Sequence, residues 1–320
     1  MGMDLGERVY GAVLGHILGD IIGIPYEGSR RRNVDVNAIM KFRCLKYRGE
    51  CVWSDDTALT LATIDALVSY GYSLEAIASN FIQWYVNGKY SSHGRPFGIG
   101  RTVRRALNNL LKGKPPTSSG LKDEFSNGNG SLMRIMPVPL YFHCRDLKTV
   151  IEKVHEVSAI THAHPRSLVG CGLYSIMVYY IIRGYDKHKA YDRMVEEANR
   201  IYGSWEPFGS EMYKYYSRII KKELPYLSRK EIKSTGYVVY TLEAILWLFL
   251  NSRNYVETIV NAISLGHDTD TIAAIAGSLA GLYHGIRGIP NELITCIPRL
   301  EWIMELINKY IEAIKRQCSL

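Results

Sequence analysis

The sequence predicts an all-α protein, a multi-helix globule that forms a single domain over residues 1–320. Helical stretches follow one another along the chain, and no series of segments alternates apolar and polar residues as strands do. No linker divides the chain into two folding units. With 47% hydrophobic and 22% charged residues, the composition is that of an ordinary globular protein. The predicted helices are 8–24, 56–70, 74–87, 101–113, 146–160, 165–183, 186–200, 209–224, 238–251, 254–265, 271–284 and 299–315.

The first predicted helix, 8–24, carries a glycine at every fourth residue from 11 to 23. Four glycines would weaken an exposed helix by about 1 kcal/mol each relative to alanine. The stripe therefore indicates close approach to another backbone or to a ligand. The residue before a proline avoids the helical conformation, so Pro25 ends the helix. Asp20 and Glu27 place acids near this end.

The next predicted helix begins among the oxygen-rich side chains of Ser54, Asp55 and Asp56, in the run WSDDT. An acid or a hydroxyl before an apolar helix is most often a cap. Two adjacent carboxylates at the start of a buried helix are nevertheless costly, unless an ion pair, protonation or a metal compensates them. The run therefore allows two interpretations, a helix cap or a metal site.

Two loops flank the helix at 101–113. The run GRPFGIG at 94–100 predicts a loop from its Gly and Pro content. Residues 114–130 form a long loop without an apolar period, and long loops in compact domains are often functional. The following run, GNGSLMR at 128–134, offers backbone amides that could hold a phosphate with Arg134 behind them. Taken alone, the run is better explained by a plain Asn-Gly turn.

The run THAHP at 161–165 separates two further helices. Its His162 and His164 are either ligands, a polar clamp on a substrate, or satisfied residues at a helix end. From residue 186 onward, helical stretches are joined by polar loops that contain Gly or Pro.

The run HDTDT at 267–271 precedes a helix whose small residues recur every three or four positions, which predicts burial. Asp270 is a candidate N-cap. Asp268 and Asp270, like the acids of WSDDT, have no Lys or Arg in their own stretch. Because a hard divalent cation takes oxygen ligands, we predict such a cation where the two acidic helix starts meet.

The net charge of +8 includes basic clusters at 30–32, 101–105 and 112–114. This charge suits an anionic partner such as a phosphate ester or a nucleic acid, or it is only a solvated surface. No specific nucleic-acid-binding motif accompanies it. The six cysteines show neither CxxC nor regular spacing, which favours reduced thiols in a cytoplasmic protein. Acids near the N-terminus do not fit a signal peptide, and no run of eighteen apolar residues predicts a membrane span. We expect a cytoplasmic monomer without a membrane partner.

Six motifs, taken in order, resemble the ADP-ribosylglycohydrolase family. They span residues 11–285: GAVLGHILGDIIGIPYEG, WSDDT, GRPFGIGRT, GNGSLMRIMP, ITHAHP and GHDTDTIAAIAGSLAG. The resemblance implies an all-α orthogonal bundle with a central cleft that holds two Mg²⁺ or Mn²⁺ ions. It also implies a hydrolase that cleaves an N- or O-glycosidic bond at ribose C1. Such an enzyme releases ADP-ribose from an ADP-ribosylated protein, nucleic acid or small molecule.

The resemblance assigns residues by motif. The implied metal ligands, with Asp270 bridging the two ions, are Ser54, Asp55, Asp56, Asp268, Asp270 and Thr271. The implied catalytic acids are Glu27, Asp55 and Asp56. The implied substrate-binding residues are Gly128, Asn129, Gly130, Ser131, Leu132, Met133, Arg134 and His162.

Two departures from the family pattern bear on function. His267 stands where the family commonly has Gly, and Gly98 stands where arginine-specific members have Asp. The second departure puts arginine specificity in doubt and leaves the general base open among the three catalytic acids. The alternative functions are another dinuclear hydrolase, such as a phosphoesterase, and a non-catalytic ADP-ribose-binding or structural relative. The intact acid set argues against a non-catalytic role.

Overall fold

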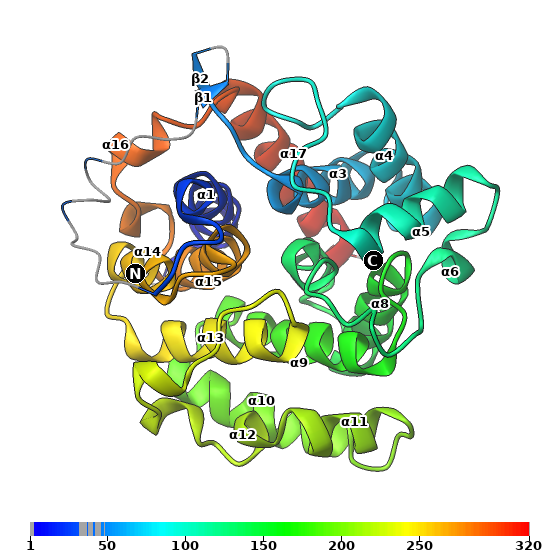
Figure 1. The fold of residues 1–320 in the computed structure, drawn as a ribbon, viewed down its shortest axis with the longest axis vertical. Helices are drawn as coiled ribbons and strands as arrows, with labels where there is room; N and C mark the ends of the chain where they lie inside the picture. Colours follow the sequence, from blue (N-terminus) through cyan, green and yellow to red (C-terminus); the bar gives the residue numbers. More distant parts are fainter. Residues whose placement is uncertain (1–2, 32–36, 38–40, 42–45, 48, 320) are drawn as a thin grey trace.

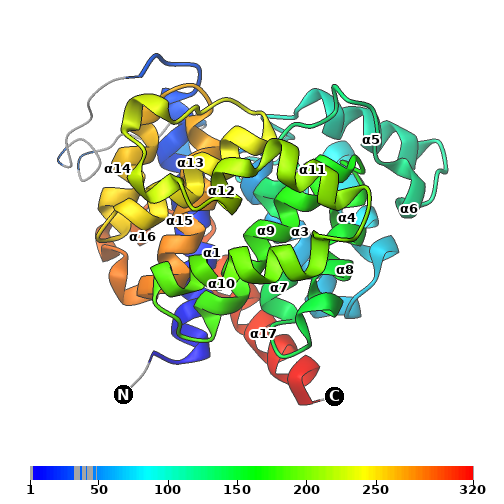
Figure 2. The ribbon, with the colours of Figure 1, turned by 90° about the horizontal axis from the view of Figure 1, so that it is seen from below.

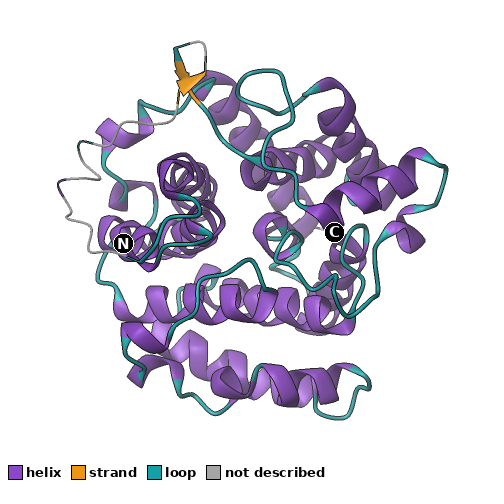
Figure 3. Cartoon of the chain, in the orientation of Figure 1, coloured by secondary structure: helices purple, strands orange, loops and turns teal. Residues whose placement is uncertain are grey.

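The computed structural model describes residues 3–31, 37, 41, 46–47 and 49–319. Across these residues the predicted all-α fold is confirmed, and the strands form one small antiparallel hairpin (Figure 3). The α-helices are α1 (Leu5–Gly23), α3 (Asp55–Tyr70), α4 (Leu74–Asn87), α5 (Arg101–Leu111), α6 (Pro116–Ser119), α7 (Pro137–Tyr141), α8 (Leu147–Ala159), α9 (Pro165–Ile182), α10 (Lys187–Tyr202), α11 (Phe208–Tyr215), α12 (Ser217–Ile220), α13 (Val238–Asn251), α14 (Tyr255–Leu265), α15 (Thr269–His284), α16 (Asn291–Ile294) and α17 (Leu300–Ser319). The short 3₁₀ helices are η1 (Ile24–Tyr26), η2 (Leu132–Arg134), η3 (Leu224–Tyr226), η4 (Arg229–Glu231) and η5 (Ile286–Gly288), and the strands are β1 (Lys46–Tyr47) and β2 (Glu50–Cys51).

Helix α1 packs against α15 along most of its length, and Figure 1 shows the two helices side by side. The glycine stripe makes this contact. A Cβ on Gly11 would lie 2.1 Å from the Gly281 carbonyl oxygen, and one on Gly19 would lie 2.1 Å from the Ala273 carbonyl oxygen. Because no side chain fits between the two backbones, the stripe is required for close packing. This packing brings the start of α15 to the end of α1.

Asp20, on α1, fixes the start of α3. Its carboxylate accepts hydrogen bonds from the backbone amides of Ser54 (3.0 Å) and Thr57 (3.1 Å). These amides belong to the first turn of a helix, where they have no intrahelical partner. Ser54 also caps the helix, because its Oγ accepts from the Asp56 amide. Helix α3 is thereby tied to α1, and its first two acids face the same region as the start of α15.

The remaining helices build layers around this pair. Helices α10, α11 and α12 form an outer layer against α9 and α13, as Figures 1 and 2 show. One hydrophobic cluster of buried side chains extends from Val9 to Ile314. Most of the predicted helix boundaries agree with the structure to within two residues. The predicted helix 209–224 is instead two helices, α11 and α12, that meet at Tyr216.

The short helices α6, α7 and α16 were not predicted. Each has only four or five residues, too few for an apolar period to be visible. Asp270 is not the N-cap of α15, as the sequence suggested. The helix begins at Thr269, so the N-cap is Asp268, and Asp270 lies in the first turn.

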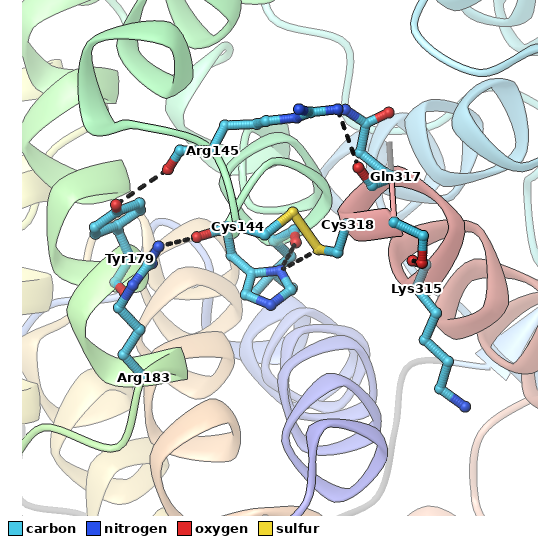
Figure 4. The surroundings of a disulfide bond; sticks show 10 residues. Cys144, Arg145, Tyr179, Arg183, Lys315, Gln317 and Cys318 are labelled. Carbon is cyan, nitrogen blue, oxygen red and sulfur yellow. Dashed lines mark hydrogen bonds between the residues drawn. A yellow bond between two sulfur atoms is a disulfide. The ribbon is translucent and has the colours of Figure 1, made fainter.

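A disulfide joins Cys144, which follows α7, to Cys318 in α17, with the Cα atoms 5.5 Å apart (Figure 4). The expectation of reduced thiols is wrong for these two residues. They are 174 residues apart in sequence, and the pairing depends on tertiary contacts that their spacing does not reveal. Beside the disulfide, Arg145 donates to the Gln317 carbonyl oxygen at 3.2 Å. The cytoplasmic location stays a prediction.

Within the described residues, only Leu5–Tyr26 has the length and hydropathy that a membrane span needs. In the structure 83% of its apolar window is buried against other parts of the chain. This burial is that of a core helix.

Candidate active site

A cavity of about 320 Å³ opens where α3, α5 and α15 begin. Its volume falls within the usual range of ligand-binding pockets. The cavity is lined by Glu27, Asp55, Asp56, Gly98, Gly100, Arg101, Thr102, Val103, Phe125, Gly128, Asn129, Gly130, Met133, His162, Gly236, Asp268, Asp270 and Thr271.

The two acidic helix starts meet in this cavity. The Thr271 hydroxyl, on α15, donates to Asp56 Oδ2, on α3, at 3.3 Å. The same oxygen accepts from Ser54 Oγ at 3.0 Å. In the same cavity, Asn129 Nδ2 donates to Asp268 Oδ2 at 2.6 Å. Segments that are more than two hundred residues apart in sequence therefore share one hydrogen-bonded network.

The carboxylates lie in a poorly solvated environment. Burial raises the pKa of Asp55 and of Asp56 well above its ordinary value, and the nearby charge of Asp20 raises both further. Burial, followed by the charge of Asp268, has the same effect on the pKa of Asp270. Both causes disfavour the charged form.

Two carboxylate oxygens in this cluster have no hydrogen-bond partner within the part of the chain that the structure describes. They are Asp56 Oδ1 and Asp270 Oδ1, and both are buried. No ion pair between described residues neutralises either acid. An unpaired buried carboxylate is costly, and a hard cation with oxygen ligands would remove that cost. Ser54, Asp55, Asp56, Asp268, Asp270 and Thr271 therefore form an oxygen donor set that could hold such a cation.

Glu27 differs from the buried acids. It follows η1, lines the cavity and is exposed to solvent. Partial burial of its carboxyl, and then the nearby charge of Asp268, raise the pKa of Glu27 above its ordinary value. The carboxyl is therefore accessible to a molecule in the cavity.

The glycine loop forms another wall of the cavity. Gly128, Asn129 and Gly130 line it, together with Met133 and His162. A Cβ on Gly130 would lie 2.9 Å from His162 Cε1, so only glycine fits between this loop and the histidine. The loop is held in place because the backbone amide of Asn129 donates to the carbonyl oxygen of Gly236, another cavity-lining residue, at 3.0 Å.

Three predicted substrate-binding residues do not line this cavity. Ser131, Leu132 and Arg134 are fully buried. The Arg134 guanidinium donates to Thr161 Oγ1 at 2.7 Å and lies over the Phe81 ring, 4.5 Å from its centroid. The Arg134 side chain thus points into the core, and its role behind a bound phosphate stays a prediction.

The run GRPFGIG contributes more than the sequence suggested. Gly98 has a positive φ of 80°, and a Cβ there would lie 2.7 Å from Asp55 Oδ1. An aspartate at this position would not fit unless Asp55 moved. Exposed Phe125, in the loop 114–130, also lines the cavity. The sequence did not indicate it, because a single aromatic residue in a long polar loop forms no recognisable pattern.

The other departure has a backbone explanation. His267 has a φ of +62°, a conformation that glycine adopts without cost. Histidine is among the residue types that tolerate it best. The His267 amide donates to the Ser29 carbonyl oxygen at 2.8 Å, which ties the acidic run to the segment after Glu27.

Comparisons with known proteins identify the family of the chain. The model of the ADP-ribosylglycohydrolase family matches residues 1–319. ADP-ribosylarginine hydrolase Tri1 of Pseudomonas putida (strain GB-1) is 31% identical over 310 residues, which cover 96% of this chain and 78% of that protein. ADP-ribosyl-[dinitrogen reductase] glycohydrolase of Rhodospirillum rubrum is 26% identical, with 99% of this chain and 96% of that protein covered.

The fold comparison gives the same result. A solved structure described as an ADP-ribosylglycohydrolase-related protein complex superposes with a TM-score of 0.78 at 25% sequence identity. The match covers 98% of this chain and 99% of that one. Together with the family match over nearly the whole sequence, this shows that the chain belongs to the ADP-ribosylglycohydrolase family.

Proposed function

We propose that this protein is a magnesium- or manganese-dependent hydrolase that breaks the bond between ribose C1 and an acceptor, releasing ADP-ribose. The family supports ADP-ribosyl hydrolase activity. The observation that carries the metal dependence is the pair of buried, unpartnered oxygens of Asp56 and Asp270 in a cavity of carboxylates.

The donor set could hold two ions. Ser54, Asp55 and Asp56 would hold one, Asp268 and Thr271 would hold the other, and Asp270 would contribute to both. When bound, such ions supply positive charge that binds ribose hydroxyls and lowers the pKa of water. Magnesium or manganese suits this set better than zinc, because neither a thiol nor an imidazole is among these donors.

The protein's own acids complete the chemistry. Cleavage at ribose C1 builds positive, oxocarbenium-like charge, which nearby carboxylates stabilise. One carboxylate accepts the proton of the attacking water. Glu27 is the best candidate among the three catalytic acids, because Asp55 and Asp56 are buried in the α3 network. The tight wall at Gly130 and His162 suits the ADP-ribose part of the substrate, with the backbone close to the ligand.

The test is a product analysis. The purified protein, with Mg²⁺ or Mn²⁺, is offered ADP-ribose linked to arginine, to serine and to a nucleic-acid phosphate. Release of free ADP-ribose from at least one substrate, and its loss with a chelator, are expected. Release of AMP or phosphate instead would indicate a phosphoesterase. Full activity after chelator treatment would refute the metal dependence.

A further inference from the structure

The net positive charge of the chain lies in one segment. Residues 76–122 contain eight Lys and Arg residues and no Asp or Glu. When these eight are subtracted from the 39 Lys and Arg residues of the chain, the remainder equals its 31 Asp and Glu residues. The rest of the protein is therefore electrically balanced, and this segment alone accounts for the net charge of +8.

Helix α5 displays much of this charge on one face. Val103, Ala106 and Leu107 are buried, and they attach the helix to the protein. Residues three, four and seven positions apart share a helix face. The outward face therefore carries Arg101, Arg104, Arg105 and Asn108, all of them exposed, and Lys112 and Lys114 follow, also exposed. We call Arg101, Arg104, Arg105, Lys112 and Lys114 the basic rim.

Most of these charges have no acidic partner. Arg105 lies 3.9 Å from Asp123, a long contact at the surface. Arg101, Arg104, Lys112 and Lys114 form no ion pair with any acid that the structure describes. Surface charges of one sign repel each other, and an anionic partner relieves that repulsion.

The rim begins at the cavity and extends away from it. Gly100, Arg101, Thr102 and Val103 line the cavity. Figure 1 shows α5 running from there toward the edge of the molecule, where α6 lies. The diphosphate of an ADP-ribose in the cavity could reach Arg101, but the other four rim residues do not line the cavity. A longer polyanion is needed to use them.

We propose that the basic rim binds the strand of a nucleic-acid acceptor, so that ADP-ribose attached to a strand enters the cavity while the strand follows α5. This proposal rests on the proposed function and names its acceptor class. The eleven residues of α5 span about 16 Å at 1.5 Å per residue. That length matches about five nucleotides at about 3.4 Å each.

The composition of the rim favours a nucleic acid over an acidic protein. Nucleic-acid interfaces are polar and strongly positive. Protein interfaces depend instead on buried aromatic or apolar anchors. The outward face of α5 has only Leu111 as a large exposed apolar side chain, and the other residues are Arg, Lys and Asn. Arginine also binds phosphate through two parallel hydrogen bonds.

Binding is tested on the whole protein with a fluorescent ten-nucleotide single strand that carries no ADP-ribose. The variant Arg104→Gln/Lys112→Gln/Lys114→Gln removes three rim charges outside the cavity lining. The control, Arg316→Gln/Lys148→Gln/Lys189→Gln, removes one arginine and two lysines that are also exposed and without an ion pair in the described structure. Each variant lowers the net charge by three.

The rim variant should bind the strand at least tenfold more weakly at about 0.1 M salt, and the control should match the wild type. The slope of log affinity against log salt should fall by about 2 in the rim variant only, at about 0.7 per phosphate contact. Equal loss in both variants would overturn the proposal. Equal or tighter binding of an acidic peptide of the same length and charge would also overturn it, in favour of a protein acceptor.

Steady-state kinetics on two substrates distinguish a failure of the basic-rim proposal from a failure of the proposed function. The two substrates are a strand with ADP-ribose on its terminal phosphate and ADP-ribose 1″-phosphate, which has the same linkage without the strand. The rim variant should raise KM for the strand about tenfold and leave kcat, and turnover of the small substrate, unchanged. An unchanged KM for the strand would refute the rim. If the wild type cleaves neither substrate and no other ADP-ribosyl linkage, the proposed function is refuted. The strand-binding measurement would still test whether the basic rim binds a nucleic acid.

Discussion

Replacing Gly98 with alanine should reduce catalytic activity, because the new methyl group would displace the Asp55 carboxylate. The new Cβ would lie 2.7 Å from Asp55 Oδ1 and 3.1 Å from Ser54 Cβ. Ordinary contact begins at 3.4 Å, so the Asp55 carboxylate must move by several tenths of an ångström. Gly94, in the same loop, supplies the matched control. Its φ of +77° resembles the +80° of Gly98, but a Cβ there meets nothing within 4 Å.

Both substitutions place an L-residue in the left-handed backbone conformation, but only Gly98→Ala also creates a close contact with Asp55. An L-residue in the left-handed region costs about 1–2 kcal/mol, so both variants should lose that much free energy of unfolding. A displacement approaching 1 Å at a catalytic site can reduce the rate by up to about a hundredfold. We expect kcat/KM of Gly98→Ala to fall by about ten- to a hundredfold, and that of Gly94→Ala to stay within about twofold.

The assay is release of ADP-ribose at saturating Mg²⁺ or Mn²⁺, with urea unfolding measured in parallel. The free energy of unfolding corrects for any shared loss of folded protein. If both variants keep wild-type kcat/KM, the position of Asp55 does not limit catalysis and the assignment of Asp55 is wrong. If both lose activity equally, the cause is the strained loop, not the carboxylate.

Three further predictions concern Asp270, Gly130 and His155. Asp270→Asn should abolish activity, and it should abolish metal binding as measured by titration calorimetry. The helical circular dichroism should not change. An active variant would show that Asp270 is not a metal ligand. Gly130→Val should weaken ADP-ribose binding at least tenfold, because a Cβ there lies 2.8 Å from Val103 Cγ2 and 2.9 Å from His162 Cε1; unchanged ADP-ribose affinity would contradict this. Burial lowers the pKa of His155 to about 3 from its ordinary 6.5. The unfolded chain therefore binds more protons as pH falls below about 7, and this histidine alone should reduce the free energy of unfolding by about 2 kcal/mol between pH 8 and pH 5. The pH dependence of unfolding in His155→Gln should be shallower by that amount; identical pH dependence would refute the assignment.

The sequence was most informative where one residue type had one physical explanation. Glycines at every fourth position in 8–24 predicted a close backbone contact, and the structure shows that contact with α15. The acids of WSDDT and HDTDT lacked basic neighbours in sequence, and they meet in one cavity. Most helix boundaries were also predictable, because helices of three or more turns show their apolar period.

The sequence was least informative where a side chain could take either of two directions. Arg134 follows a glycine-rich loop, which suggests a phosphate ligand, but its guanidinium bonds to Thr161 in the core. The role of Asp20 was equally hidden, because a carboxylate that caps a helix from another helix leaves no local pattern. The pairing of Cys144 with Cys318 depends on how α17 packs, which spacing does not encode.

Gly98 and the basic rim both bear on which acceptor group carries the ADP-ribose. A protein-bound arginine leaves as a cationic guanidinium, which a facing carboxylate would hold. Position 98 cannot supply that carboxylate without displacing Asp55, and Arg101 adds positive charge to the cavity wall. Glu27 is the exposed acid that could take this role instead.

We therefore expect oxygen-linked ADP-ribose, attached to a phosphate or to serine, to be cleaved faster than the arginine linkage. The comparison is kcat/KM on the three linkages under one set of conditions, with Glu27→Gln measured beside the wild type. Gly98→Asp is unsuitable as a specificity test, because it would disturb Asp55 whatever the substrate. An arginine linkage cleaved tenfold faster would refute the argument. It would mean that this chain shares the acceptor named for its relative from Pseudomonas putida. Glu27 would then be the acid that faces the guanidinium, and Glu27→Gln should lose more activity on arginine than on the oxygen linkages.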